Sequence, residues 1–185
     1  MTNKTLAIVG GGDLAQAISD RMSAEFDVKI YSHSYFDIAD EDRVQDMARV
    51  LAEYNVVIVT AGEYSKDQWS MWMVNTVGPC CLISRLIEMA KGQKIIAVSS
   101  YGAAWSSWPD IDSSRLTYNN SKLALNNFLL GLVQQNASDN QITVLQPSVF
   151  QSKMSNNKGA EVNHIVDQIK HIIDNSLHIV QITVK

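Results

Sequence analysis

A short apolar run followed by glycines and a helix constrains the fold of this chain more than any other feature. Residues 5–9 read Thr-Leu-Ala-Ile-Val, and residues 10–15 read Gly-Gly-Gly-Asp-Leu-Ala. A continuous apolar run is typical of a parallel strand that helices cover on both faces. Apolar residues then recur at helical spacing, at Leu14, Ala17, Ile18 and Met22. The order of strand, glycine turn and helix predicts the first unit of an α/β fold.

The same alternation continues along the chain. Further strands are expected at 26–31, 55–62, 94–100, 141–145 and 178–184. Helices are expected at 42–54, about 67–90, 118–133 and 162–173. Alternating strands and helices predict a doubly wound, Rossmann-type parallel sheet in a three-layer α/β/α arrangement. A length of 185 residues suits one core, so we expect a single domain over residues 1–185.

Composition excludes several classes of partner. The net charge of -4 gives no basic footprint for nucleic acid or for an anionic membrane surface. The apolar run near the N-terminus is too short for a signal peptide or a membrane span. Cys80 and Cys81 are adjacent, which suits neither a zinc site nor a disulfide framework. We therefore expect a cytoplasmic protein without a metal site, its cysteines being helix core residues.

The glycine turn predicts a dinucleotide site. Gly10 and Gly12 would let the backbone approach a pyrophosphate, and the helix N-terminus at Leu14 would favour the negative charge. Asp13 argues against this, because a carboxylate there repels phosphate unless its side chain caps the helix. The alternative is a tight turn that binds no ligand.

The second strand ends in Ser32-His33-Ser34. In dinucleotide folds an acidic residue at this strand end binds the ribose hydroxyls of NAD, and none is present here. Ser32 and His33 could instead donate to a 2'-phosphate, which favours NADP over NAD, although no arginine follows directly. Asp37 is either a contact to the adenine edge or a turn residue.

The strand at 94–100 ends at Ser100, and a helical pattern contains Tyr118 and Lys122. Helix positions four apart share a face, so both side chains should point toward Ser100. A neighbouring ammonium lowers the pKa of a phenol, which would let Tyr118 act as an acid or base. A serine hydroxyl could hold a substrate oxygen. The alternative is an ordinary amphipathic helix with an exposed lysine.

A proline within a predicted helix and two tryptophans on an irregular segment each have two interpretations. Pro79 removes a hydrogen bond to the carbonyl of Asn75 within the helix at 67–90. That carbonyl must find water or another donor, unless packing merely tolerates a kink. Trp105 and Trp108 lie on a segment without clear period, where they either wall a pocket or simply pack.

Taken in order, these residues make the chain resemble the short-chain dehydrogenase/reductase family. The resemblance maps the glycine turn onto 10–15, the adenine contact onto Asp37, the end of the Asn-Asn-Ala-Gly element onto Thr60-Ala61-Gly62, the catalytic tetrad onto Asn75, Ser100, Tyr118 and Lys122, and the turn beside the nicotinamide onto Pro147-Ser148. It departs from the family in a shorter glycine turn, and in a short polar piece at 151–159 where the family has a substrate lid.

The resemblance implies hydride transfer between NADP, or NAD, and a carbonyl or alcohol substrate. Tyr118 would donate the proton, Lys122 would lower its pKa and hold the nicotinamide ribose, and Ser100 would bind the substrate oxygen. Asn75 would hold a water for proton relay. The alternative is a non-catalytic NAD(P)-binding regulator or scaffold, suggested by the shortened turn and lid.

The resemblance also implies a homodimer or homotetramer through the helices around 67–90 and 118–135. Both are richer in apolar residues than a solvated face requires, with Trp69, Trp72, Met73, Leu82, Ile83 and Ile87 on one and Leu125, Phe128, Leu129 and Leu132 on the other. The alternative is a monomer with a wide core-facing stripe.

Overall fold

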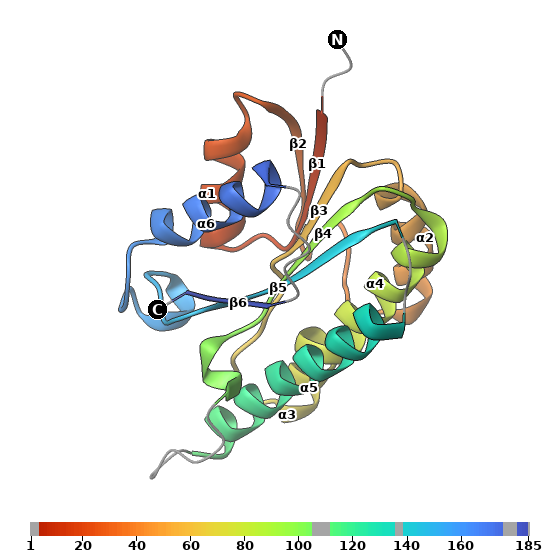
Figure 1. Cartoon of the computed structure of the whole chain (residues 1–185). Coiled ribbons are helices and arrows are strands. Elements are labelled where there is room, and N and C mark those ends of the chain that lie inside the picture. The colour runs from red at the N-terminus through yellow and green to blue at the C-terminus, as the bar shows by residue number, and fades with distance from the viewer. Residues whose placement is uncertain (1–3, 105–111, 136–138, 176–180, 185) are drawn as a thin grey trace.

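A six-stranded, entirely parallel sheet lies between two layers of helices (Figure 1). The structure is a computed structural model that describes residues 4–104, 112–135, 139–175 and 181–184. The strands are β1 (Lys4–Val9), β2 (Phe26–Tyr31), β3 (Val56–Val59), β4 (Lys94–Val98), β5 (Gln141–Pro147) and β6 (Gln181–Val184). Their spatial order is β2-β1-β3-β4-β5-β6. The predicted doubly wound parallel sheet is confirmed.

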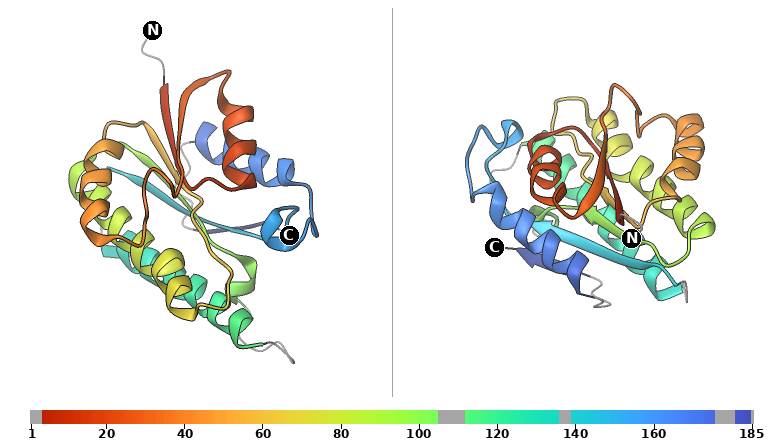
Figure 2. Two further views of the ribbon diagram at one scale, coloured as in Figure 1. Left: turned by 180° about the vertical axis from the view of Figure 1, so that it is seen from behind. Right: turned by 90° about the horizontal axis from the view of Figure 1, so that it is seen from above.

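The helices divide between the two faces of the sheet (Figures 1 and 2). They are α1 (Asp13–Met22), α2 (Glu41–Leu51), α3 (Gln68–Trp72), α4 (Gly78–Met89), α5 (Ser113–Gln135) and α6 (Val162–Asp174). Helices α1 and α6 cover one face, and α2, α4 and α5 cover the other. Within the described ranges, no helix has the length and apolar character needed to cross a membrane.

Strand β1 shows why the strands read as continuous apolar runs. Leu6 and Ile8 are fully buried in the hydrophobic cluster that contains α1 and α6. Ala7 and Val9 point the opposite way, into the cluster formed with α2, α4 and α5. Successive side chains of a strand alternate between faces, so a sheet covered on both sides needs apolar residues at every position.

The chain reverses its winding direction at β1, which places a crevice beyond the carboxyl ends of the strands. Val9 pairs with Tyr31 of β2 on one side and with Val59 of β3 on the other. The carbonyl of Val9 then accepts the N–H of Ala61 at 2.9 Å. Ligands of doubly wound folds bind in the crevice at this switch point.

Two helices differ from the predicted pattern. Helix α5 begins at Ser113, so Tyr118 lies in its second turn and does not open it. The single helix expected at about 67–90 is instead three pieces, because a π-helical segment, η1 (Met73–Val77), separates α3 from α4. Pro79 lies in the first turn of α4, where a missing N–H costs little. A π-turn is a common feature near functional sites.

Candidate active site

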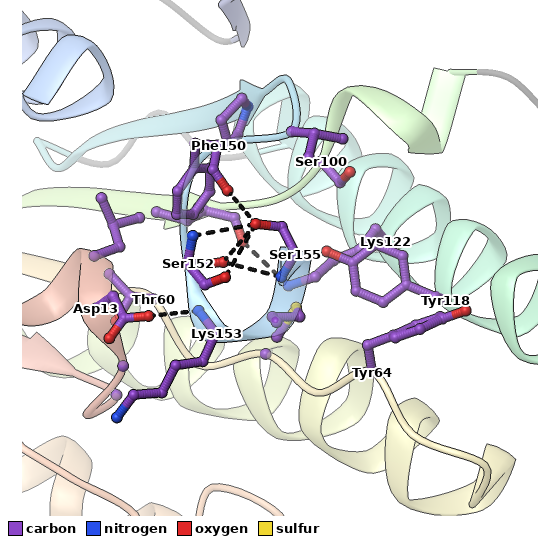
Figure 3. A pocket seen from close by; sticks show the side chains of 18 of the residues that line it. Asp13, Thr60, Tyr64, Ser100, Tyr118, Lys122, Phe150, Ser152, Lys153 and Ser155 are labelled. Atoms are coloured by element: carbon purple, nitrogen blue, oxygen red, sulfur yellow. Dashed lines mark hydrogen bonds between the residues drawn. The ribbon is translucent and has the colours of Figure 1, made fainter. Parts of the chain in front are cut away.

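A cavity of about 750 Å³ opens at the carboxyl ends of β1, β3, β4 and β5 (Figure 3). Most of the predicted site residues line it, namely Gly10, Gly12, Asp13, Leu14, Ala61, Gly62, Ser100, Tyr118, Lys122, Pro147 and Ser148. Ser32, His33, Asp37 and Asn75 do not. The glycine turn and the Ser-Tyr-Lys group therefore share one cavity, as their positions at neighbouring strand ends require.

Gly10 has a φ of +132°, a conformation that L side chains rarely adopt. A Cβ at this position would also collide with Thr60 at the end of β3. Gly12 is the N-cap of α1 and provides no side-chain cap, and a Cβ there would meet open space. The uncapped N-terminus of α1 thus faces the cavity with room for an anionic group.

The Asp13 side chain does not cap α1. Capping was the arrangement in which a carboxylate at this position was expected to tolerate a phosphate. The Oδ2 of Asp13 instead accepts the backbone N–H of Lys153 at 2.7 Å (Figure 3). This bond joins the glycine turn to the 3-10 turn η3 (Lys153–Ser155), 140 residues later. This hydrogen bond holds the carboxylate toward η3.

Ser100 and Tyr118 line the same part of the cavity. The Ser100 hydroxyl accepts the N–H of Gly102 at 3.2 Å, and Ser100 also acts on the pKa of Tyr118. Burial raises the pKa of Tyr118, while the hydrogen bond with Ser100 and the nearby charge of Arg115 act in the lowering direction. The lowered pKa that was expected for Tyr118 beside Lys122 is therefore not found: the pKa is raised, because desolvation exceeds the effects of Ser100 and Arg115.

Lys122 is buried under the end of β4. Its side chain is 3% exposed, and its Nζ donates to the carbonyls of Val98 at 3.2 Å and Ala61 at 3.4 Å. Burial lowers the pKa of Lys122 to about 8. Its ammonium thus lies at the floor of the cavity beside the backbone of β3 and β4.

Asn75 lies behind the cavity wall in the π-helical segment and is fully buried. Its Oδ1 accepts the N–H of Glu63 at 2.8 Å, and its Nδ2 donates to the Glu63 carbonyl at 2.9 Å. Nδ2 also lies 3.1 Å from the hydroxyl of Ser121, which donates to the Tyr118 carbonyl. The Asn75 side chain therefore braces α5 between Tyr118 and Lys122.

The loop after β2 lies outside the cavity, and its residues bind each other. His33 Nδ1 lies 3.5 Å from Asp37 Oδ1, which also accepts the N–H of Ala39 at 2.9 Å. The hydroxyls of Ser32 and Ser34 lie 2.9 Å apart. Asp37 thus has the turn contact that the sequence left as one alternative.

Several residues that line the cavity, or that lie beside the loop after β2, were not predicted from the sequence. Arg43 of α2 donates from Nη2 to the Tyr35 carbonyl at 3.3 Å, which places an arginine beside the loop after β2. Tyr64 and Arg115 line the cavity next to Tyr118. Val149, Phe150, Met154 and Ser155 line it from the segment that follows β5. Trp105 and Trp108, expected as a possible wall, lie outside the described residues.

The segment after β5 is short but ordered by its own hydrogen bonds. Ser152 and Ser155 form a capping box around η3, and the Ser155 hydroxyl also donates to the Phe150 carbonyl (Figure 3).

The described residues contain no group of three or more His, Cys, Asp or Glu side chains that could hold a metal ion.

No protein-family model matches this sequence, and no curated protein is a significant sequence match. Solved structures match it in fold over nearly its whole length. The crystal structure of BdcA in complex with NADPH has a TM-score of 0.83 at 17% identity, covering 99% of this chain and 94% of that chain. The protein lin1944 from Listeria innocua has a TM-score of 0.82 at 11% identity, covering 98% and 100%.

A short chain dehydrogenase from Burkholderia cenocepacia J2315 in complex with NADP has a TM-score of 0.83 at 16% identity. The match covers 99% of this chain and 96% of that chain. At these identities the likeness concerns the fold. The chain has the fold of the short-chain dehydrogenases/reductases.

Proposed function

We propose that the chain is an NADP-dependent oxidoreductase of the short-chain dehydrogenase/reductase family that acts on a carbonyl or alcohol. One observation carries the proposal: Ser100, Tyr118 and Lys122 line one cavity together with an uncapped glycine turn. This arrangement combines an anion site with a proton donor, which reduction of a carbonyl by a dinucleotide needs.

The residues present fit the cofactor. The N-terminus of α1 and the open space at Gly12 suit a pyrophosphate, and Ala61, Gly62, Pro147 and Ser148 line the cavity toward Tyr118. Two of the solved structures similar in fold hold NADPH or NADP. When bound, the reduced cofactor supplies a hydride.

Tyr118 donates a proton to the substrate oxygen, and Ser100 holds that oxygen by a hydrogen bond. The raised pKa of Tyr118 keeps its phenol protonated at neutral pH, which suits reduction better than alcohol oxidation. Lys122 places a positive charge at the floor of the cavity. Asn75 acts as a positioning residue, because its bonds hold Glu63 and Ser121 and do not reach the cavity.

The choice of NADP rests on the loop after β2. It carries the Ser32 and Ser34 hydroxyls and the His33 ring, and the Arg43 guanidinium lies beside it. A guanidinium is the group that most often binds a phosphate by two parallel hydrogen bonds. Asp37 Oδ1 lies 3.5 Å from His33 Nδ1 and orients the ring. Ser32 contacts the glycine turn, so a 2'-phosphate here would belong to the same nucleotide.

Tyr118→Phe tests the proton donor. It should lower kcat by about 10² to 10⁴, the usual contribution of general acid catalysis, while the affinity for NADPH stays unchanged. Tyr54→Phe removes a tyrosine hydroxyl that bonds Tyr31 away from the cavity, and it should keep activity. Full turnover of a genuine carbonyl substrate by Tyr118→Phe would show that Tyr118 is not the donor.

A second candidate is a cofactor-binding regulator or scaffold without chemistry. It is favoured by the hydrogen bonds of the Lys122 ammonium to two backbone carbonyls, because an ammonium engaged in this way has a structural role without any catalysis. A screen of aldehydes, ketones and quinones that follows NADPH absorbance separates the two. Binding of NADPH by calorimetry without turnover across the panel would favour the regulator.

We also propose that the chain forms a dimer through α3, η1, α4 and α5. Leu82, Ile83, Leu125 and Leu129 are buried in the core, so the predicted stripe is partly core-facing. Other apolar residues of these elements remain exposed, namely Trp69 (74%), Val77 (41%), Leu116 (41%) and Phe128 (41%). Surface of this kind often marks an interface.

A further inference from the structure

The cavity has two ends that differ in their charged residues. Asp13 and Lys153 lie at the glycine turn, and the Lys153 side chain extends away from the tyrosines (Figure 3). Tyr64 and Tyr118 lie together at the other end (Figure 3). Arg115 lines the cavity and contacts Tyr64, which places its charge at the tyrosine end. The cofactor phosphates would occupy the first end, so the second end is where a substrate lies.

Arg115 is held beside Tyr118 by three features. It precedes Tyr118 by three residues on α5, so both share a helix face. Its guanidinium carbon lies 5.0 Å from the centre of the Tyr64 ring. The Tyr64 ring in turn meets Tyr118 edge-on, with ring centres 5.6 Å apart and an interplanar angle of 90°. Tyr64 therefore links the guanidinium to the proposed proton donor.

Arg115 has no acidic partner for its guanidinium among the residues that the structure describes. Asp112 lies close, but its carboxylate accepts the backbone N–H of Arg115 at 2.7 Å. By contrast, Arg49 and Arg85 each pair with a carboxylate three residues away. Arg115 thus presents unused donors at the substrate end of the cavity.

The other nearby cation cannot take this role. Lys122 is buried, and its ammonium donates to the Val98 and Ala61 carbonyls. Burial also lowers its pKa to about 8, so it is a weaker partner for an anion than an arginine, which stays charged. The planar fork of an arginine matches a carboxylate by two parallel hydrogen bonds. An exposed, stacked guanidinium beside a proton donor is suited to a substrate that carries both a carboxylate and a carbonyl.

We propose that the substrate is an oxo acid, whose carboxylate Arg115 binds while its carbonyl oxygen lies between Ser100 and Tyr118. This inference rests on the proposed oxidoreductase function. The apolar side chains of Val149, Phe150 and Met154 line the cavity and suit the carbon chain between the two groups. The change is reduction of an oxo acid to a hydroxy acid, with the hydride from NADPH, which becomes NADP⁺, and the proton from solvent through Tyr118.

The test compares α- and β-oxo acids with their methyl esters, which differ in charge and keep the carbonyl. Turnover is followed by loss of NADPH absorbance for the wild type, Arg115→Gln and Arg115→Lys. Arg49→Gln is the matched control, since it removes the same charge from α2, away from the cavity. In parallel, calorimetry measures binding of the same acids and esters to the NADP⁺-loaded protein, where no reaction can occur.

We expect the wild type to prefer the acids. Arg115→Gln should raise KM and weaken binding of the acids by about 10- to 100-fold, the usual loss of a charge-assisted hydrogen-bond pair, and leave the KM and the binding of the esters unchanged. Any change in kcat that acts through the pKa of Tyr118 should be the same for acids and esters. Arg115→Lys should restore part of the loss, and Arg49→Gln should behave as wild type. Unchanged unfolding midpoints would exclude misfolding as the cause.

If the wild type reduces acids and esters equally well and Arg115→Gln has no effect, the proposal of an oxo acid substrate is wrong. The proposed oxidoreductase function would still stand. If no carbonyl is reduced, the proposed function fails and the calorimetric titration decides the anion site. Acids that bind the loaded protein, and bind more weakly to Arg115→Gln, support the site. Absence of binding by every acid overturns it.

Discussion

The buried Lys122 makes a prediction about stability that needs no substrate. Burial lowers its pKa from 10.5 to about 8. Between these two pH values the unfolded chain carries a proton on Lys122 that the folded chain has lost. The unfolded state therefore binds more protons, and the free energy of unfolding rises with pH in this window. Below about pH 8 the full cost of burying the charge is present, and above pH 10.5 it disappears.

The magnitude follows from the two pKa values. A shift of this size lowers the free energy of unfolding by about 3 kcal/mol at low pH. Between about pH 7 and pH 9.5 the free energy of unfolding should rise by about 2 kcal/mol as Lys122 loses its proton in the folded state. The side chain is 3% exposed, so solvent screening reduces this figure little. Lys122→Met removes the titrating group. The stability of the wild type relative to Lys122→Met should therefore increase by about 2 kcal/mol over this range.

Urea unfolding of both proteins at several pH values across this window measures the difference. Comparison with the variant cancels the tyrosines and surface groups that titrate in both. Lys91→Met, which removes an exposed lysine after α4, should run parallel to the wild type. A difference between wild type and Lys122→Met that stays constant with pH would show that Lys122 is not desolvated as the structure indicates.

Three further predictions concern other parts of the molecule. Asp13→Ala should lower the free energy of unfolding by about 1 kcal/mol, because the exposed hydrogen bond from the Lys153 N–H is lost. Asp13→Asn should lower it less and bind NADPH more tightly. Urea unfolding and calorimetry check both variants, and equal effects of the two would contradict the reasoning. Arg43→Gln should weaken NADPH binding about 10-fold and leave NADH unchanged in calorimetry, and equal losses would exclude a 2'-phosphate contact. Phe128→Asp should convert a dimer to a monomer in light scattering, and an unchanged dimer mass would place the interface elsewhere.

Apolar runs predicted the strands well because every strand of a sheet covered on both faces must be apolar. The start of α5 at Ser113 was not predicted, because the sequence there lacks an apolar pattern. Residues 113–117 have no clear apolar period, so they read as loop. A local signal was present in Asp112, whose side chain accepts the Arg115 N–H in the manner of an N-cap. The π-helical segment has no such signal, since it depends on how α3 and α4 pack.

The candidate site was predictable where strand ends and helix spacing determine it. Ser100 and Tyr118 meet because one ends a central strand and the other lies on the helix that follows. Contacts between distant segments could not be predicted, because the stack of Arg115 on Tyr64 joins α5 to the loop after β3. His33 was expected to contact a 2'-phosphate, and Asp37 was either an adenine contact or a turn residue, but their side chains lie 3.5 Å apart and pair with each other.

The order of elements along the chain has a consequence during synthesis. Helix α1 packs on α6, so Ile18 is covered by a helix that begins only at Val162. The bond between Asp13 and the Lys153 N–H likewise waits for the last quarter of the chain. Chains emerge from the ribosome N-terminus first and at a limited rate. The nascent protein therefore exposes the apolar side of its first βαβ unit until α6 has emerged.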